Sequence, residues 1–311
     1  MSRIIVLEHK RNTEVAKATT SDIFDYFKKY NINVINYNKF FDESLDKNIN
    51  KNDILVVYSH PSKEEKYDNR FKKINCKKIL RSIDGYNTCG RPYYKTIKNM
   101  CRLEIDKLIP VHFNKNLESF LLKENISFIH VPFCLDFSNK RKIENKVHDM
   151  SFTGQLNFEA YPVRTRIAHY FSKYNFNNIK LVQLPWPGYE ISNSKHNIIG
   201  EKYIDFLSQS WLGVTCRGGW RNGLVGKYLE LGKAGSLPVC DVPDIMPSNM
   251  QELVISIDET VDNNILNEKV FNALENKTIL KEKIQNYQNL CEKHFDYNVV
   301  VSNFIKACRE I

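Results

Sequence analysis

Apolar residues recur along the first half of the chain in short runs, separated by longer polar stretches with helical periodicity. The runs predict strands and the periodic stretches predict helices. The predicted strands are Ile4–Leu7, Ile32–Ile35, Ile54–Tyr58, Lys78–Ile83 and Ile126–Val131. The predicted helices are Ser21–Tyr30, Tyr94–Lys107 and Asn116–Glu124. Strands that alternate with helix-length segments indicate a parallel sheet with crossover helices.

The pattern restarts after a charged stretch over residues 139–146 that lacks apolar periodicity. The second set of predicted strands is Met150–Phe152, Ile179–Leu184, Leu212–Cys216, Leu237–Cys240 and Val254–Ile257. The second set of predicted helices is Arg164–Tyr174, Tyr203–Gln209, Leu224–Lys233, Lys277–Lys293 and Val299–Arg309. Two consecutive α/β units of similar size are therefore expected.

The length agrees with this division, because 311 residues leave room for two domains of roughly 100–200 residues each. We expect an N-terminal domain over residues 1–138 and a linker over 139–148. A C-terminal domain over 149–292 follows, and the chain ends in a helix over 293–311.

The composition is that of a soluble globular protein, with 42% hydrophobic and 26% charged residues. It excludes collagen-like, low-complexity and disulfide-scaffold chains. No apolar run reaches the ~20 residues that span a bilayer, and the N-terminus meets Glu8 and His9 too soon for a signal peptide. Eight scattered cysteines without a Cys-x-x-Cys pair are typical of free thiols in a reducing compartment. We expect a cytoplasmic protein.

The net charge of +9 is concentrated in one half of the chain. Residues 1–145 hold 27 basic and 18 acidic residues, whereas residues 146–311 hold 18 of each. The basic half could attract phosphates, anionic lipids, nucleic acid or an acidic substrate, or its lysines could simply cover a solvated face. No nucleic-acid-binding motif accompanies the densest run, Lys63–Arg81.

The segment Cys216–Gly223 joins a predicted strand to a predicted helix and has the sequence CRGGWRNG. Its glycines, among them Gly218 and Gly219, allow backbone N–H groups to approach a bound group closely, and the following helix offers its N-terminal dipole to an anion. Arg217 adds a fork-shaped cation suited to phosphate oxygens. The segment is typical of a diphosphate-binding loop; the alternative is a glycine-rich turn with arginines in solvent.

Lys227 and Glu230 lie three residues apart on the helix that follows this loop. Such a pair is usually an ion pair on the protein surface, which stabilises a helix by roughly 0.2–0.5 kcal/mol. Beside a phosphate-binding loop, Lys227 would instead meet a diphosphate and Glu230 would accept hydrogen bonds from ribose hydroxyls.

Residues 226–239, GKYLELGKAGSLPV, resemble the nucleotide-sugar signature of GT-B glycosyltransferases. Further stretches are similar in the same order: residues 149–155 resemble the first strand and glycine turn of the family's C-terminal domain, and Arg164 and Arg166 the arginines of its first helix. Residues 199–214 resemble the segment that leads to the donor loop. The likeness covers roughly residues 126–311 and is nearest to the spore-maturation-type branch and its viral relatives.

The resemblance implies an α/β fold of two Rossmann-like parallel-sheet domains that face each other across a cleft. The C-terminal domain would hold the donor and the N-terminal domain the acceptor, and the last helix would cross back to the N-terminal domain. The expected donor-binding residues are Gly154, Arg164, Arg217, Gly218, Gly219, Asn222, Lys227 and Glu230. Asn222 stands where many retaining members carry a second Glu, so inverting and retaining reactions both stay open.

Glycosyl transfer needs stabilisation of a nucleoside-diphosphate leaving group, which a helix dipole, Lys227 and Arg217 could supply without metal. The chain contains no Asp-x-Asp and no His-Glu-x-x-His, so we expect no metal and no cofactor besides the nucleotide-sugar co-substrate. An inverting reaction also needs a general base. Asp84, which follows a predicted strand, is the leading candidate; His9 and His60 are alternatives, and each could instead be a structural loop residue.

The sequence thus predicts a metal-independent glycosyltransferase that moves a sugar from a nucleotide-activated donor to a glycan or other hydroxyl acceptor. It predicts no specific nucleic-acid partner, and the basic half is compatible with a peripheral membrane contact. Two alternatives belong to other classes: a polyanion- or nucleic-acid-binding α/β protein, and a catalytically silent paralogue that binds a sugar nucleotide.

Overall fold

The computed structural model describes residues 2–8, 23–58, 67–82, 100–144, 146–173, 179–185, 198–217 and 223–310. These residues form two compact units. The first contains the described residues up to Phe133 together with those from Asn298 onwards, and the second contains those from Cys134 to Tyr297.

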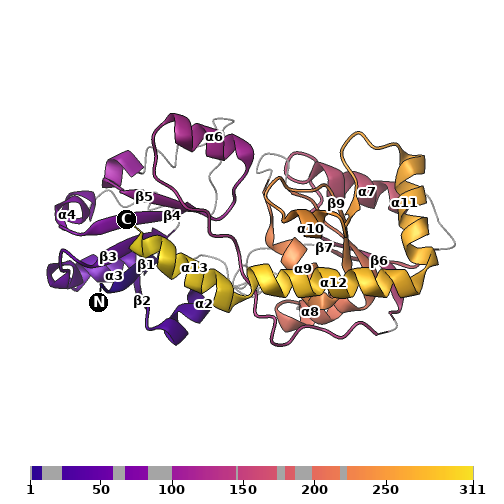
Figure 1. The fold of residues 1–311 in the computed structure, drawn as a ribbon, viewed down its shortest axis with the longest axis horizontal. Coiled ribbons are helices and arrows are strands. Elements are labelled where there is room, and N and C mark those ends of the chain that lie inside the picture. Colours follow the sequence, from indigo (N-terminus) through magenta and orange to yellow (C-terminus); the bar gives the residue numbers. More distant parts are fainter. Residues whose placement is uncertain are drawn as a thin grey trace. The chain divides into compact units, whose positions relative to one another are not determined.

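The first unit is a five-stranded parallel sheet with helices (Figure 1). The strands are β1 (Ile4–Glu8), β2 (Asn33–Asn36), β3 (Ile54–Tyr58), β4 (Lys77–Ser82) and β5 (Lys107–Pro110). The α-helices are α2 (Phe24–Phe27), α3 (Tyr37–Asp42), α4 (Asp68–Lys73), α6 (Lys115–Lys123) and α13 (Tyr297–Arg309), with 3-10 turns at Lys28–Tyr30 and Leu45–Asn48. The strand order is β2-β1-β3-β4-β5. The two strands β1 and β3 at the middle of the order are almost wholly apolar, as is typical of parallel strands that are covered on both faces.

The second unit repeats this design, with the strand order β10-β9-β8-β6-β7. Its strands are β6 (His148–Gly154), β7 (Leu181–Pro185), β8 (Ser210–Val214), β9 (Leu237–Cys240) and β10 (Ile255–Ser256). Its helices are α7 (Pro162–Lys173), α8 (Glu201–Ser208), α9 (Gly226–Ala234), α10 (Ser248–Gln251), α11 (Asn263–Glu275) and α12 (Lys277–Phe295). Counted from its own first strand, this order is the same as that of the first sheet. It is the 2-1-3-4-5 order of a doubly wound fold.

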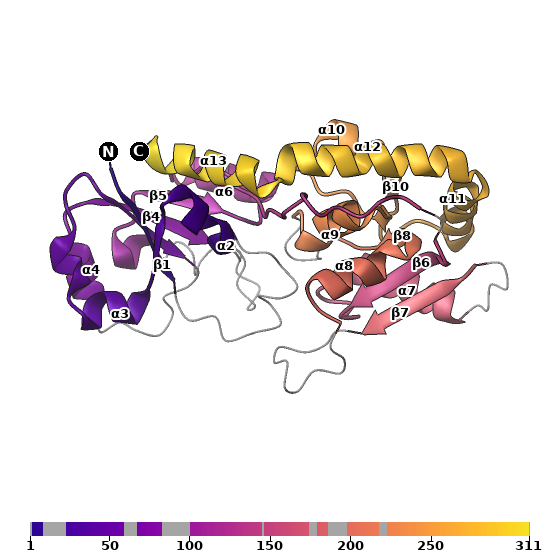
Figure 2. The ribbon, with the colours of Figure 1, turned by 90° about the horizontal axis from the view of Figure 1, so that it is seen from below.

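Helix α9 is tightly packed against its neighbours in the second unit, where it contacts α8 and α12 (Figure 2). A Cβ atom on Gly213 of β8 would lie 2.1 Å from Leu231 Cδ2, and one on Gly232 would lie 2.4 Å from Cys291 Sγ. Both glycines therefore allow α9 to approach the sheet on one side and α12 on the other. Since α9 carries Lys227 and Glu230, this packing holds the candidate site in place.

Helix α13 belongs to the first unit. Its Phe304 ring lies 5.0 Å from the ring of Phe27, and the guanidinium of the buried Arg81 lies 5.5 Å from the Phe304 ring. Lys107 Nζ donates to the carbonyl of Glu310 at 3.0 Å. The end of the chain is thus bound to the sheet that begins it.

The predicted strand Ile126–Val131 is wrong. This segment runs beside β5 but forms a single bridge, between Phe128 and Leu108, and the fifth strand is Lys107–Pro110. That strand is only four residues long and ends in proline. The sequence pattern assigned its first residue, Lys107, to the end of a predicted helix and therefore missed the strand. The described part of the predicted helix Tyr94–Lys107 ends earlier, because Glu104 has a φ of +53°.

Arg141, in the charged stretch over residues 139–146, binds helices α8 and α12 of the second unit. Arg141 pairs with Glu201 at 2.7 Å and with Asp205 at 2.6 Å, and Lys233 pairs with Glu201 at 2.8 Å. Gln288 donates to the Arg141 carbonyl at 3.0 Å. The stretch has no apolar periodicity because ion pairs and hydrogen bonds of Arg141 attach it to the second unit.

Candidate functional site

The second sheet reverses its winding between β6 and β8. From β6 the chain adds β7 on one side and then returns to add β8 and β9 on the other. Open parallel sheets bind ligands outside the carboxyl ends of their strands at such a switch point. Gly154 ends β6, and Arg217 lies three residues beyond the end of β8. The topology therefore brings two of the predicted donor residues to the expected edge.

The Lys227 ammonium lies at this edge and is held by groups from three elements. Its Nζ donates to Thr153 Oγ1 at the end of β6 at 2.8 Å and to the hydroxyl of Tyr203 on α8. Glu230 Oε2 lies 3.6 Å away, on the same helix as Lys227. Burial lowers the pKa of Lys227 to about 8, an effect that Glu230 opposes and Arg164 increases.

Gly154 lies beside the side chains of two cationic residues. A Cβ atom there would lie 3.5 Å from Arg164 Nη1 and 3.8 Å from Lys227 Cε. The residue has a φ of +89°, a conformation that other residues adopt only at a cost. The glycine therefore permits the turn at the end of β6 and leaves the guanidinium of Arg164 and the side chain of Lys227 uncovered by a side chain of its own. Two neighbouring cations suit an anion with several oxygens.

Arg164 is held rigidly although it carries a charge. It is 4% exposed, its Nη2 donates to the Gln155 carbonyl at 2.6 Å, and its guanidinium lies 3.9 Å from the centroid of the Tyr161 ring. Stacking on an aromatic face and a backbone hydrogen bond fix the plane of the guanidinium. Its Nε is buried and has no hydrogen-bond partner among the residues that the structure describes. The cation is thus pre-oriented towards Gly154.

Glu230 is buried, at 4% exposed. Burial raises its pKa, and the nearby Lys227 and Arg164 partly offset this effect. Its carboxylate is the acceptor that a ligand's hydroxyl groups could meet beside the two cations. The alternative of a solvent-exposed ion pair does not hold, because the side chains of Lys227 and Glu230 are 12% and 6% exposed.

Arg217 is paired inside the protein. Its backbone N–H donates to Asp241 Oδ1 at 2.8 Å, and its Nε lies 3.0 Å from Asp241 Oδ2. The Tyr228 hydroxyl donates to the carbonyl of the same Asp241 at 2.5 Å. Asp241 is buried, and burial raises its pKa. Arg217 thus anchors the start of the predicted loop to the end of β9.

Arg166 fixes a neighbouring loop. Its Nη1 donates to the Glu259 carbonyl at 2.7 Å, and its Nη2 donates to the Val261 carbonyl and, at 3.2 Å, to Asn263 Oδ1. These contacts hold the segment between β10 and α11. The resemblance implied similar positions for Arg164 and Arg166, but their contacts differ. Arg164 lies beside Gly154, whereas Arg166 binds the segment between β10 and α11.

The structure brings together Gly154, Arg164, Lys227 and Glu230, and places Arg217 at the start of the loop. The predicted donor residues Gly218, Gly219 and Asn222, and the candidate bases Asp84, His9 and His60, lie outside the described residues.

Sequence reasoning missed three residues: Thr153, Tyr203 and Asp241. Thr153 gives a weak signal, because it precedes the glycine that ends a strand. Tyr203 and Asp241 give none, because a tyrosine on an amphipathic helix and an aspartate after a strand are commonplace.

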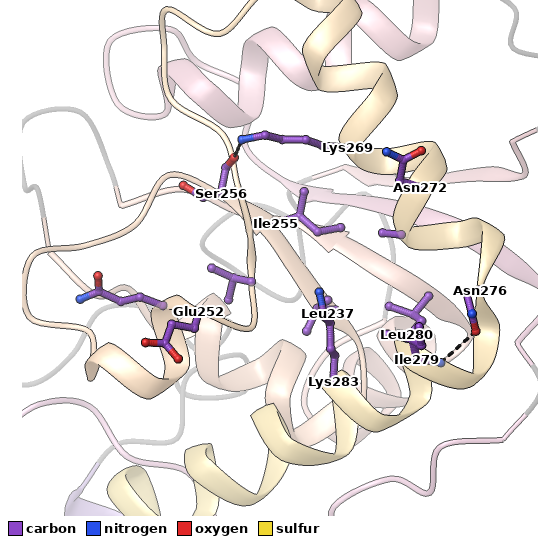
Figure 3. Close-up of a pocket in the computed structure, with 13 residues that line it drawn as sticks. Leu237, Glu252, Ile255, Ser256, Lys269, Asn272, Asn276, Ile279, Leu280 and Lys283 are labelled. Atoms are coloured by element: carbon purple, nitrogen blue, oxygen red, sulfur yellow. Dashed lines mark hydrogen bonds between the residues drawn. The ribbon is translucent and has the colours of Figure 1, made fainter.

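A cavity of about 520 Å³ lies elsewhere in the second unit (Figure 3). Leu237, Ile255 and Leu280 line its apolar part, and Lys269 at its rim donates to the Ser256 carbonyl at 2.8 Å. Leu237 begins β9, whereas the candidate site follows the carboxyl ends of β6 and β8. Among the described donor residues, Gly154, Arg164, Arg217, Lys227 and Glu230, none lines this cavity, so the cavity is separate from the site that these residues form.

Within the described ranges, no cluster of three or more histidine, cysteine, aspartate or glutamate side chains is arranged to hold a metal ion. No described helix combines the length and the apolar character that a membrane span requires.

No protein-family model matches the chain, and no curated protein matches it significantly. Solved structures do. An α,α-trehalose-phosphate synthase (UDP-forming) from Burkholderia vietnamiensis has a TM-score of 0.60 at 9% identity, and HepE from Anabaena in complex with UDP-glucose has a TM-score of 0.57 at 8% identity. Each alignment covers 100% of both chains.

TarM from S. aureus, in complex with fondaparinux, alpha-GlcNAc-glycerol and UDP, has a TM-score of 0.56 at 10% identity over 86% of this chain. The chain spans 58% of the length of TarM. These neighbours are GT-B glycosyltransferases, and the two five-stranded parallel sheets match theirs. The predicted fold class is confirmed: the chain has the GT-B fold of two Rossmann-like parallel-sheet domains.

Proposed function

We propose that this protein is a glycosyltransferase that moves a sugar from a nucleotide-activated donor to a hydroxyl group of a glycan or other acceptor. The observation that carries the proposal is the pair of cationic side chains, Arg164 and Lys227, that both lie beside Gly154 at the switch point of the second sheet. Neighbours of the same fold were solved with UDP or UDP-glucose, which supports a sugar nucleotide as the ligand.

In this proposal the second unit binds the donor and the first unit binds the acceptor. Arg164 and Lys227 contact the diphosphate, and Glu230 accepts hydrogen bonds from the ribose hydroxyls. Arg217, Gly218, Gly219 and Asn222 complete the donor loop. The assignment of the last four residues rests on the sequence alone.

Transfer breaks the bond between the anomeric carbon of the sugar and the diphosphate oxygen, and negative charge develops on the leaving group. Fixed cations in a site of low dielectric stabilise that charge. In the proposed site Lys227 and Arg164 supply these cations, and we propose that no metal takes part. If the reaction inverts the anomeric centre, a base takes the proton of the acceptor hydroxyl; Asp84 is the proposed base, with His9 and His60 as alternatives.

The likeness to the spore-maturation-type branch and its viral relatives, which covers roughly residues 126–311, stays part of the proposal. The cytoplasmic location is likewise a proposal. The acceptor is proposed to be a glycan or glycoconjugate, and the basic first half leaves a peripheral membrane contact open.

Thermal melting with a panel of nucleoside diphosphates and sugar nucleotides tests the proposal. A specific ligand at about 100 times its dissociation constant stabilises the fold by about 2.7 kcal/mol. The Lys227→Met variant should lose this stabilisation. Lys233→Met is the matched control, because Lys233 lies on the same helix but pairs with Glu201; that variant should melt earlier yet retain the nucleotide-induced shift.

Three results would decide between the function classes. Stabilisation by a sugar nucleotide, followed by release of the nucleoside diphosphate, supports the enzyme. Stabilisation without turnover across acceptors indicates the silent paralogue. Stabilisation by polyanions alone, lost steeply with salt, would overturn the proposed donor site.

A further inference from the structure

The Lys227 ammonium is held by two neutral hydroxyl groups more closely than by its carboxylate neighbour. Thr153 Oγ1 is 2.8 Å away and the Tyr203 hydroxyl is closer still, whereas Glu230 lies at 3.6 Å. The two hydroxyl oxygens are themselves 2.7 Å apart. An ammonium has three N–H donors and each hydroxyl offers lone pairs, so the three groups form a closed hydrogen-bonded triangle.

This triangle fixes the position of a side chain that is otherwise flexible. A lysine carries roughly 2 kcal/mol of rotamer entropy, and a ligand that orders it must offset that loss. Tyr203 is rigid because it is 7% exposed and packs in one cluster with Leu207 and Leu231. Its ring centroid also lies 4.7 Å from Lys227 Nζ, so both its ring and its hydroxyl restrain the ammonium.

The neutrality of the two hydroxyls matters for an anionic ligand. Burial and the Glu230 carboxylate raise the pKa of the Tyr203 phenol, so this hydroxyl stays uncharged. A carboxylate in its place would neutralise the ammonium before a diphosphate arrived. The hydroxyls accept hydrogen bonds from Lys227 and leave its positive charge available.

We propose that Tyr203, together with Thr153, is a positioning residue that holds the Lys227 ammonium charged and aimed at the diphosphate of the donor. The inference rests on the proposed function, because it assumes that Lys227 meets the diphosphate. It goes beyond that function by assigning a role to two residues outside the set of donor contacts.

The experiment measures UDP binding by isothermal titration calorimetry between pH 7 and 9.5, where the diphosphate is fully ionised because the second pKa of a phosphate is about 6. UDP affinity of the wild-type protein should fall above pH 8 as Lys227 loses its proton. The other titratable or charged groups that face Lys227 are Glu230, Arg164, Cys216 and Tyr203, so each variant is compared with the wild-type protein over the same pH range.

Tyr203→Phe keeps the ring and removes the hydroxyl. We expect UDP to bind about 10-fold more weakly at pH 7 and the alkaline midpoint to fall by about 0.5–1 pH unit, because an acceptor that favours the charged ammonium is lost. Thr153→Val should move the midpoint in the same direction, and Thr153→Ser should restore most of it. Tyr170→Phe is the matched control: the Tyr170 hydroxyl contacts Asn267 and lies outside the triangle.

The outcomes separate the two proposals. If the wild-type protein binds UDP in a Lys227-dependent way and Tyr203→Phe has the wild-type midpoint, Tyr203 has no positioning role and the donor site stands. A lower affinity without a change in midpoint would also overturn the positioning role, since general loosening of the fold accounts for it. If Lys227→Met binds UDP as the wild-type protein does, the donor site itself is wrong.

Discussion

The carboxylate of Glu230 lies 3.6 Å from the ammonium of Lys227, one helical turn along α9, and both side chains are almost completely buried. Burial raises the pKa of Glu230 and lowers the pKa of Lys227, so each group is held in a state that costs free energy. A buried ion pair often adds little to stability, because desolvation offsets its attraction. Perturbed groups of this kind cluster at functional sites, which agrees with a pair kept for a ligand.

Glu230→Gln separates the proposed ribose contact from the phosphate contact. We expect UDP affinity at pH 7 to fall about 10-fold, because hydrogen bonds to a charged acceptor contribute about 1.5–3 kcal/mol. Inorganic pyrophosphate, which carries no ribose, should bind within about threefold of the wild-type affinity. Calorimetric titration of both ligands checks this, and an equal loss for the two would assign Glu230 to the positioning of Lys227 alone.

Gly154→Ala should impair both stability and nucleotide binding. A side chain at a φ of +89° is strained by about 1–2 kcal/mol, and the new methyl group would lie beside the side chains of Arg164 and Lys227. Gly235→Ala is the matched control, because Gly235 also has a positive φ, of +68°. It follows the C-terminal end of α9, whereas Lys227 lies near the N-terminal end of that helix. Gly235→Ala should lower the melting temperature similarly and leave UDP binding unchanged. If both variants bind UDP with the same affinity, Gly154 does not lie beside the bound nucleotide.

Arg217 and Asp241 should be energetically coupled. Arg217→Met leaves a buried carboxylate without its cation and should lower the free energy of unfolding by about 1–3 kcal/mol, whereas adding Asp241→Asn should recover part of this loss. Urea unfolding followed by tryptophan fluorescence reports on the second unit alone, since Trp186, Trp211 and Trp220 all fall in its sequence. Additive losses in the double variant would show that the pair does not anchor the loop.

His130 should make the first unit sensitive to acid. Burial lowers its pKa to about 4, an effect that Arg81 increases, while a hydrogen bond with the Val111 carbonyl opposes it. The unfolded chain takes up a proton near pH 6.5 and the folded chain does not, so stability is lost as the pH falls from 6.5 towards 4. The loss should reach about 2–3 kcal/mol.

Scanning calorimetry between pH 4 and 7 checks this prediction. His130→Gln should weaken the pH dependence of the melting temperature of the first unit. That unit's transition is the one that tryptophan fluorescence does not detect, because all three tryptophans fall in the sequence of the second unit. His169→Gln, at an exposed position in the second unit, is the control and should leave that dependence unchanged. An unaltered slope in His130→Gln would assign the acid sensitivity to other groups.

Asp84→Asn tests the proposed base. It should abolish sugar transfer while UDP affinity stays at the wild-type value, because the base acts on the acceptor. Parallel His9→Gln and His60→Gln variants test the two alternatives by the same assay. Turnover by Asp84→Asn close to that of the wild-type protein would remove Asp84 as the base.

The sequence alone predicted most of the strands, because a strand covered on both faces leaves a continuous apolar run. It failed at β5, where four residues ending in Pro110 are too few to show a period. It also left out α3, α4, α10 and α11. The first two are short, and their aromatic or charged residues have no clear amphipathic repeat.

The sequence by itself determined the doubly wound class, the position of the glycine-rich loop, and the residues Gly154, Arg164, Lys227 and Glu230, since these depend on local patterns and on a family signature. Only the tertiary structure decided what those residues touch. Thr153 and Tyr203 lie 74 and 24 residues from Lys227 along the chain, and Asp241 lies 24 residues from Arg217. Contacts between strand ends and helices arise when the sheet forms and have no period in the sequence, so the partners of the buried charges became visible only in the fold.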